Sequence, residues 1–131
     1  DLQGLSEDEK IVQSFINHNK IDLAIVVLCS AQIERQLSLL LQLQKLHIPC
    51  VLALNMHDEA KKMGITINAQ LLEKKLNAPV IKTSAKYGEG IIELLKASTQ
   101  VMNQKITAPI IKIKALHASD LISHDKKIQT Q

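Results

Sequence analysis

Residues 50–58, which read Cys50-Val-Leu-Ala-Leu-Asn-Met-His-Asp58, decide the fold that we expect of this chain. The first five are apolar, and such a short, uninterrupted run is typical of a strand that is buried on both faces of a parallel sheet. A second run of this kind, DLAIVVL, occupies 22–28, and a third strand is predicted over 80–83. We therefore expect three parallel strands.

Helical patterns separate these apolar runs. The Ser6-Glu7-Asp8-Glu9 capping box predicts a helix through about Asn17, with an apolar inner side. Further helices are predicted over 33–46, 59–63, 68–76 and 91–102. The inner side of the first helix is expected to comprise Ile11, Val12, Phe15 and Ile16. Strands alternating with helices indicate an α/β fold, a three-layer parallel sheet flanked by helices.

Composition narrows the class of protein. The chain has 131 residues, of which 46% are hydrophobic and 22% charged, so we expect one folded domain and little disorder. Tyr87 and Phe15 are the only aromatic residues, which argues against a stacking surface for single-stranded nucleic acid. No apolar run reaches the roughly 18 residues of a membrane-spanning helix.

Two residue types that often carry chemistry show no such pattern here. Cys29 and Cys50 fall in apolar, strand-like runs, so we interpret them as reduced core residues. The five histidines lack metal-ligand spacing and are predicted to lie on the surface. They are His18, His47, His57, His117 and His124.

Asn55 and Asp58 follow the second predicted strand, at the edge where open parallel sheets bind ligands. A carboxylate there can accept two N–H bonds from one flat edge, and guanine presents such an edge through its ring N1–H and exocyclic amine. Each charge-assisted bond of this type contributes about 1.5–3 kcal/mol. Asn55 can contact the base and tie neighbouring loops together. The alternative is that Asp58 only caps a short helix.

Ser84, Ala85 and Lys86 follow the third predicted strand. Small residues allow the main chain to approach a flat ligand, and the Ala85 N–H could donate to a base carbonyl. The aliphatic part of Lys86 could cover the base. Alone, these residues would be an ordinary loop between strand and helix. Beside Asn55 and Asp58, they predict a guanine site.

Asp1 and Gly4 fit an Asp-x-x-Gly pattern. In that pattern the Asp contacts a phosphate-bound Mg²⁺ through water, and the Gly N–H meets a terminal phosphate. A tetrapeptide of this kind is weak evidence by itself. It agrees, however, with the two other loops.

Taken in order, these motifs resemble the GTP-binding domains of the Ras-like and Era-like GTPases, and most closely the ferrous iron transport protein B family. The guanine motif reads Asn-Met-x-Asp, with Met56 where most GTPases carry Lys. The segment 33–37 (IERQL) and the run 71–90 (LLEKKLNAPVIKTSAKYGEG) also follow the family pattern. The resemblance covers about residues 6–102.

The resemblance implies a partial P-loop NTPase fold and a set of functional roles. Residues 1–104 would be the C-terminal part of the GTPase domain, and 105–131 a tail or the start of a following helical domain. Asn55 and Asp58 would recognise guanine with Met56 over its plane, and residues 84–86 would complete the pocket. GTP or GDP and Mg²⁺ would be the cofactors, with Asp1 reaching the metal through water.

The resemblance also implies a setting for the chain. Family members are GTPase domains on the cytoplasmic face of the bacterial inner membrane, followed in the same protein by a helical domain and a membrane region that imports Fe²⁺. No nucleic acid is expected as a partner. A homo-oligomer is compatible with the resemblance.

Two departures from the family pattern bear on activity. First, the chain contains no Gly-x-x-x-x-Gly-Lys-Ser/Thr loop, and the threonine-bearing switch segment is missing as well. Second, Gly4 runs straight into residues 5–9, where the family usually has several more residues, and Gln3 stands where Pro is common. We therefore expect GTP hydrolysis from the complete domain and none from this chain alone. The alternatives are an Era-like GTPase acting on RNA or ribosomes, and a degenerate GTPase-derived interaction module.

Overall fold

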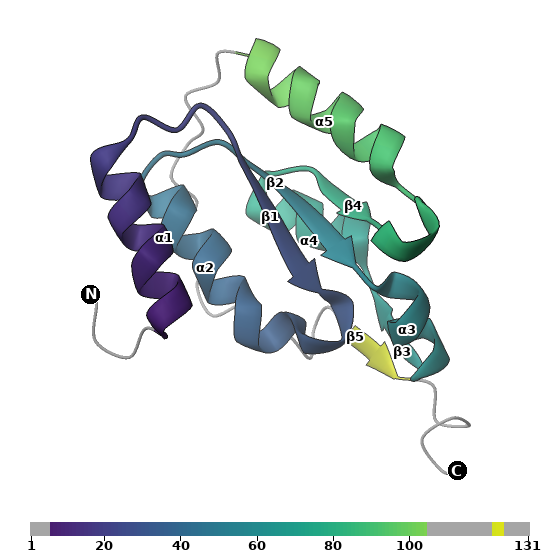
Figure 1. Ribbon diagram of the computed structural model, residues 1–131. Coiled ribbons are helices and arrows are strands. Elements are labelled where there is room, and N and C mark those ends of the chain that lie inside the picture. Colours follow the sequence, from purple (N-terminus) through teal and green to yellow (C-terminus); the bar gives the residue numbers. More distant parts are fainter. Residues whose placement is uncertain (1–5, 105–121, 125–131) are drawn as a thin grey trace.

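The structure is a computed structural model that describes residues 6–104 and 122–124. Helices and strands alternate along the chain, with two short 3₁₀ turns (Figure 1). The elements are α1 (Glu7–His18), β1 (Ala24–Cys29), η1 (Ser30–Gln32), α2 (Ile33–Lys45), β2 (Cys50–Asn55), α3 (His57–Lys62), β3 (Ile65–Ile67), α4 (Ala69–Leu76), β4 (Val80–Lys82), η2 (Ala85–Tyr87), α5 (Ile91–Asn103) and β5 (Ile122–His124).

The central sheet contains three parallel strands in the order β1-β2-β4, which confirms the predicted α/β fold. Cys29 at the end of β1 pairs with Asn55 at the end of β2. Leu54, one residue before, pairs with Lys82 at the end of β4. Because all three strands end at the same edge, the loops that follow them meet there.

Helices cover the two faces of this sheet unequally. The apolar residues of α2 and α4 pack with Val26, Leu28, Leu52, Leu54 and Val80 into one core. On the other face α5 packs over β2, where Val51 and Ala53 are buried. Figure 1 shows α1 and α2 on one side of the strands and α5 on the other.

β1 differs from its prediction. Ile25 and Val27 point to the α5 side of the sheet, and they remain 44% and 61% exposed. The prediction that this strand is buried on both faces is therefore wrong, whereas it is confirmed for β2. The physical reason is that α5 lies over β2 and leaves this face of β1 without a cover among the described residues.

The first helix forms as predicted, but its apolar residues do not pack as predicted. Ser6 caps α1 through a complete capping box, with the Ser6 hydroxyl accepting from Glu9 N–H at 3.2 Å. No residue of α1 is buried, and Ile11 and Phe15 are largely exposed. Ile16 packs against the core only in part.

A second, two-stranded sheet was not predicted. β3 pairs antiparallel with β5, so Ile65 lies opposite His124 and Ile67 opposite Ile122. The region 105–131, expected to be a tail or the start of a helical domain, thus contains a strand at residues 122–124. The rest of that region lies outside the described residues.

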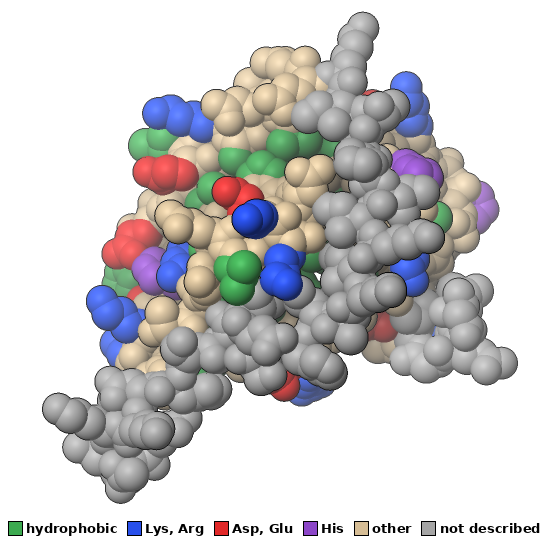
Figure 2. All heavy atoms as spheres, turned by 180° about the vertical axis from the view of Figure 1, so that it is seen from behind, with side chains coloured by type: hydrophobic (Ala, Val, Ile, Leu, Met, Phe, Trp, Pro, Cys, Tyr) green, Lys and Arg blue, Asp and Glu red, His purple; other side chains and the backbone are tan. Residues whose placement is uncertain are grey.

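Among the described residues, the face of the molecule shown in Figure 2 has no large area of a single charge. On the side opposite to that of Figure 1, acidic and basic side chains alternate with apolar ones in the coloured area (Figure 2).

Within residues 6–104 and 122–124, no helix is long and apolar enough to cross a membrane. Cys29 and Cys50 are both free, and burial raises the pKa of the Cys50 thiol to about 11.

Candidate functional site

Asn55 joins the loops that follow β2 and β4. Its side-chain Oδ1 accepts a hydrogen bond from the Ala85 N–H at 3.0 Å and another from the Thr83 hydroxyl at 3.3 Å. Both loops leave the sheet at its carboxyl edge, so one amide can reach them. The predicted tie between the two loops is therefore confirmed, and it brings the Asn55 and Ser84 regions together.

The loop after β4 is closed on itself. Ser84 and Glu89 exchange two backbone hydrogen bonds of 3.0 Å each, and Ser84 is buried. Thr83 N–H donates to Leu54 O at 2.8 Å, which anchors the start of the loop to β2. A Cβ at Gly90 would lie 2.3 Å from the Lys82 carbonyl oxygen, so only glycine fits there. The loop is rigidly placed against the sheet edge.

Asp58 lies in the first turn of α3 and is half-buried. The residue at the N-cap of α3 is Met56, and no side chain caps this helix. Within residues 6–104 the Asp58 carboxylate takes part in no hydrogen bond or ion pair. The alternative role as a helix cap is thus not what the structure shows. A half-buried carboxylate without a partner suits a ligand that brings its own N–H donors.

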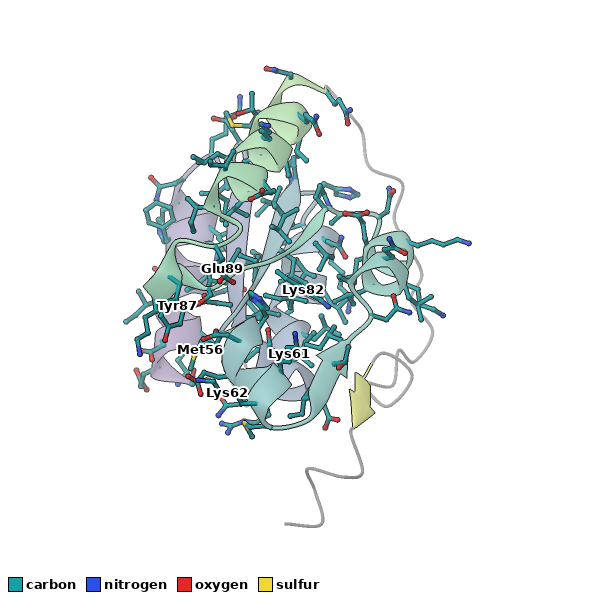
Figure 3. All side chains as sticks on the ribbon, turned by 90° about the vertical axis from the view of Figure 1, so that its right-hand side faces the viewer. Met56, Lys61, Lys62, Lys82, Tyr87 and Glu89 are labelled. Atoms are coloured by element: carbon teal, nitrogen blue, oxygen red, sulfur yellow. The ribbon has the colours of Figure 1, made fainter. Side chains whose placement is uncertain are left out.

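Met56 has a backbone conformation that is unusual for its type. Its φ of 60° lies in the left-handed region, which costs a non-glycine residue about 1–2 kcal/mol. The side chain is 44% exposed, and its Sδ lies 3.9 Å from the Cys29 Sγ. Figure 3 labels Met56, Tyr87 and Glu89 in the same region of the view, with Met56 below the other two. The turn thus presents an apolar side chain at the sheet edge.

Ala85 and Lys86 are both exposed, and their contacts refine the prediction. The Ala85 N–H donates to Asn55 Oδ1. The expected donation from the Ala85 N–H to a base carbonyl stays a prediction. The Lys86 ammonium lies 5.4 Å from the centre of the Tyr87 ring, a cation–π distance.

His57 is a residue that the sequence interpretation missed. It was predicted to lie on the surface, but it is half-buried, with its side chain 29% exposed. Its Nδ1 lies 3.0 Å from Thr83 O and its Nε2 lies 3.4 Å from Glu89 Oε2. The position of His57 in the sequence, between the predicted site residues Met56 and Asp58, was the signal from which a place at the site could have been predicted. Asp1 and Gly4, the predicted phosphate and Mg²⁺ residues, lie outside the described residues.

Comparisons with known proteins decide the family. The sequence profile described as "Ferrous iron transport protein B" matches residues 1–98. The chain belongs to the ferrous iron transport protein B family. The Fe(2+) transporter FeoB of Synechocystis is 45% identical over 97 residues, which are 74% of this chain and 16% of that protein. The chain therefore spans about one sixth of this curated relative.

Solved structures of the family agree with the fold. The FeoB G-domain from Methanococcus jannaschii matches with a TM-score of 0.72 and 38% identity, covering 79% of this chain and 65% of that one. The cytosolic domain of the T. maritima FeoB iron transporter in its GMPPNP form matches with a TM-score of 0.71 and 36% identity, covering 77% and 40%. This FeoB family membership favours the transporter interpretation over the Era-like alternative.

Proposed function

We propose that this chain reads the guanine base within the GTP-binding domain of a ferrous iron transporter. The observation that carries the proposal is the hydrogen bond from Ala85 N–H to Asn55 Oδ1, at 3.0 Å. It joins the end of β2, three residues before Asp58, to the loop of residues 84–86 at the edge of a parallel sheet where ligands bind. Relatives solved with GMPPNP and GDP support a guanine nucleotide as the ligand.

Each residue of the site has a distinct proposed role. The Asp58 carboxylate accepts the guanine N1–H and amine hydrogens, and Asn55 holds the two loops at the required distance. Met56 covers one face of the base with its apolar side chain, and the stem of Lys86 covers the other. Ser84 and Ala85 keep the main chain close to the base, since neither has a bulky side chain.

Hydrolysis needs groups beyond this site. Asp1 would hold Mg²⁺ through a water and Gly4 would contact the terminal phosphate, as the family pattern implies. Mg²⁺ neutralises charge on the phosphates when bound, while catalysis of phosphoryl transfer depends on positioning and electrostatics. Because the chain contains no phosphate-binding loop, we expect it to bind guanine nucleotide weakly and to hydrolyse no GTP by itself.

The open face of β1 supports a place within a larger domain. Ile25 and Val27 would be covered by a preceding part of the same protein, which also supplies the phosphate loop. Residues 1–104 would then end the GTPase domain, and 105–131 would lead into a helical domain and a membrane region. The membrane region would import Fe²⁺. The GTPase domain of the same protein would lie on the cytoplasmic face of the bacterial inner membrane.

The substitution Asp58→Asn tests the assignment in the full-length gene product that carries this chain. An asparagine cannot accept both guanine hydrogens, but its amide can donate to the oxygen of xanthine, which replaces the guanine amine. We expect GTP affinity to fall by a factor of 10² or more, with binding regained for xanthosine triphosphate. Fluorescent nucleotide binding measures both.

The matched control is Glu59→Gln, which removes a carboxylate from the next residue of the same helix. Glu59 pairs with Lys62 at 4.0 Å and should leave base selectivity unchanged. If the Asp58→Asn protein bound GTP as the wild type does, or if Glu59→Gln switched the selectivity, the guanine assignment would be wrong.

A further inference from the structure

His57 connects the two loops at the sheet edge through main-chain and side-chain atoms. Its backbone N–H lies 3.3 Å from Thr83 O, and its Nδ1 lies 3.0 Å from the same oxygen. A carbonyl oxygen only accepts, so Nδ1 must carry a proton and donate. One residue thus places two donors on the carbonyl of Thr83, the residue that follows β4.

The same ring reaches the far end of the loop after β4. Its Nε2 lies 3.4 Å from the Glu89 carboxylate, and Glu89 closes the loop by two backbone hydrogen bonds to Ser84. The imidazole therefore contacts residues that open and close the loop of 83–89.

The position of His57 in the chain makes these contacts relevant to the guanine site. His57 is the first residue of α3, and Asp58 is the second. α3 has only six residues and no capping side chain, so its own hydrogen bonds hold its first turn weakly. The bonds from His57 to Thr83 O fix this turn, and with it the Asp58 backbone, relative to the Ser84–Lys86 loop.

We propose that His57 is a positioning residue for guanine recognition: it holds the Asp58 turn against the loop after β4. The inference rests on the proposed function, because it assumes that the Asp58 carboxylate meets the base. Asn55 ties the same two loops from the strand side, at Ala85 and Thr83. His57 ties them from the helix side, so the base site is held from both directions.

The test compares His57→Ala and His57→Asn in the full-length gene product, with GDP and inosine diphosphate as probes. Inosine lacks the exocyclic amine, so the ratio of the two affinities reports how well the carboxylate meets that amine. We expect His57→Ala to weaken GDP binding about tenfold and inosine diphosphate binding less, which lowers the ratio. His57→Asn keeps a donor for Thr83 O and should restore most of the selectivity.

The control is His18→Ala. The His18 side chain hydrogen-bonds within α1, with Nδ1 2.7 Å from Ser14 O, and α1 contributes no residue to the proposed base site, so this change should leave both affinities unaltered. An equal loss for both nucleotides in His57→Ala, or an asparagine variant no better than alanine, would overturn the positioning role. If the wild-type protein bound neither nucleotide, the proposed function itself would fail, which is a different outcome.

Discussion

β1 and β2 have nearly the same composition but very different surroundings. Both strands are six residues of mainly aliphatic side chains, paired in register along their whole length. In β2 the side chains on both faces are buried, with Val51 and Leu52 fully enclosed. In β1 Ile25 and Val27 are largely exposed. Burial in this fold is therefore set by the neighbours of a strand and not by its own residues.

The largest expected difference between the two strands is the loss in free energy of unfolding when an aliphatic side chain is replaced by alanine. Leu52→Ala should lower the free energy of unfolding by about 2–5 kcal/mol, because it leaves a cavity between β2 and the helices. Val27→Ala in β1 should change it by less than about 0.5 kcal/mol in this chain. Urea denaturation followed by circular dichroism measures both. Equal losses would mean that the α5 side of β1 is covered after all.

The second expected effect is a dependence of the stability of the folded chain on pH, caused by the buried Cys50 thiol in β2. Burial raises the pKa of Cys50 from 9.0 to about 11, so the folded chain keeps this proton where the unfolded chain loses it. The free energy of unfolding should therefore fall as the pH rises from 9 to 11, by about 2 kcal/mol.

Cys50→Ala removes the titrating thiol and is the matched variant for this effect. In it the pH-dependent loss between 9 and 11 should shrink, although the variant starts from a lower stability. Denaturation midpoints at several pH values give the comparison. An unchanged slope in Cys50→Ala would assign the alkaline loss to other groups.

The smallest expected effect concerns α1, whose apolar residues are mostly exposed. Ser6→Ala breaks the capping box and should cost about 0.5–1 kcal/mol, since it leaves helix N–H groups without an acceptor. Ser14→Ala, on the same helix but away from its cap, serves as the control. Amide hydrogen exchange should show faster opening of α1 in Ser6→Ala alone, and no difference between the variants would exclude a stabilising cap.

Much of the fold could be predicted because its signals are local. The apolar run at 50–54, the capping box at Ser6 and the helical pattern at 68–76 each mark an element within a few residues, and the structure confirms all three. β3 was missed because Ile65–Ile67 is short and its partner strand begins at Ile122, far along the chain. A pairing over that distance leaves no periodic pattern.

The candidate site was predictable in its parts but less so in its connections. Asn55 and residues 84–86 could be predicted as site residues because each directly follows a predicted strand. They could be expected to lie close together because parallel strands end at the same edge of a sheet. The role of His57 depends on Thr83 and Glu89, which come together with it only in the folded chain. The open face of β1 likewise depends on which helix lies above it, and α5 could not be assigned to β2 from its own sequence.

The outer edge of β1 has a consequence for handling the protein. β1 ends the order of the central sheet, so among the described residues its outward N–H and C=O groups have no strand opposite them. Such an edge, beside bare aliphatic side chains, is a template on which another extended chain can assemble. Preparations of this chain at high concentration should accordingly tend toward self-association, and adding a soluble peptide that pairs with β1 should keep them monomeric.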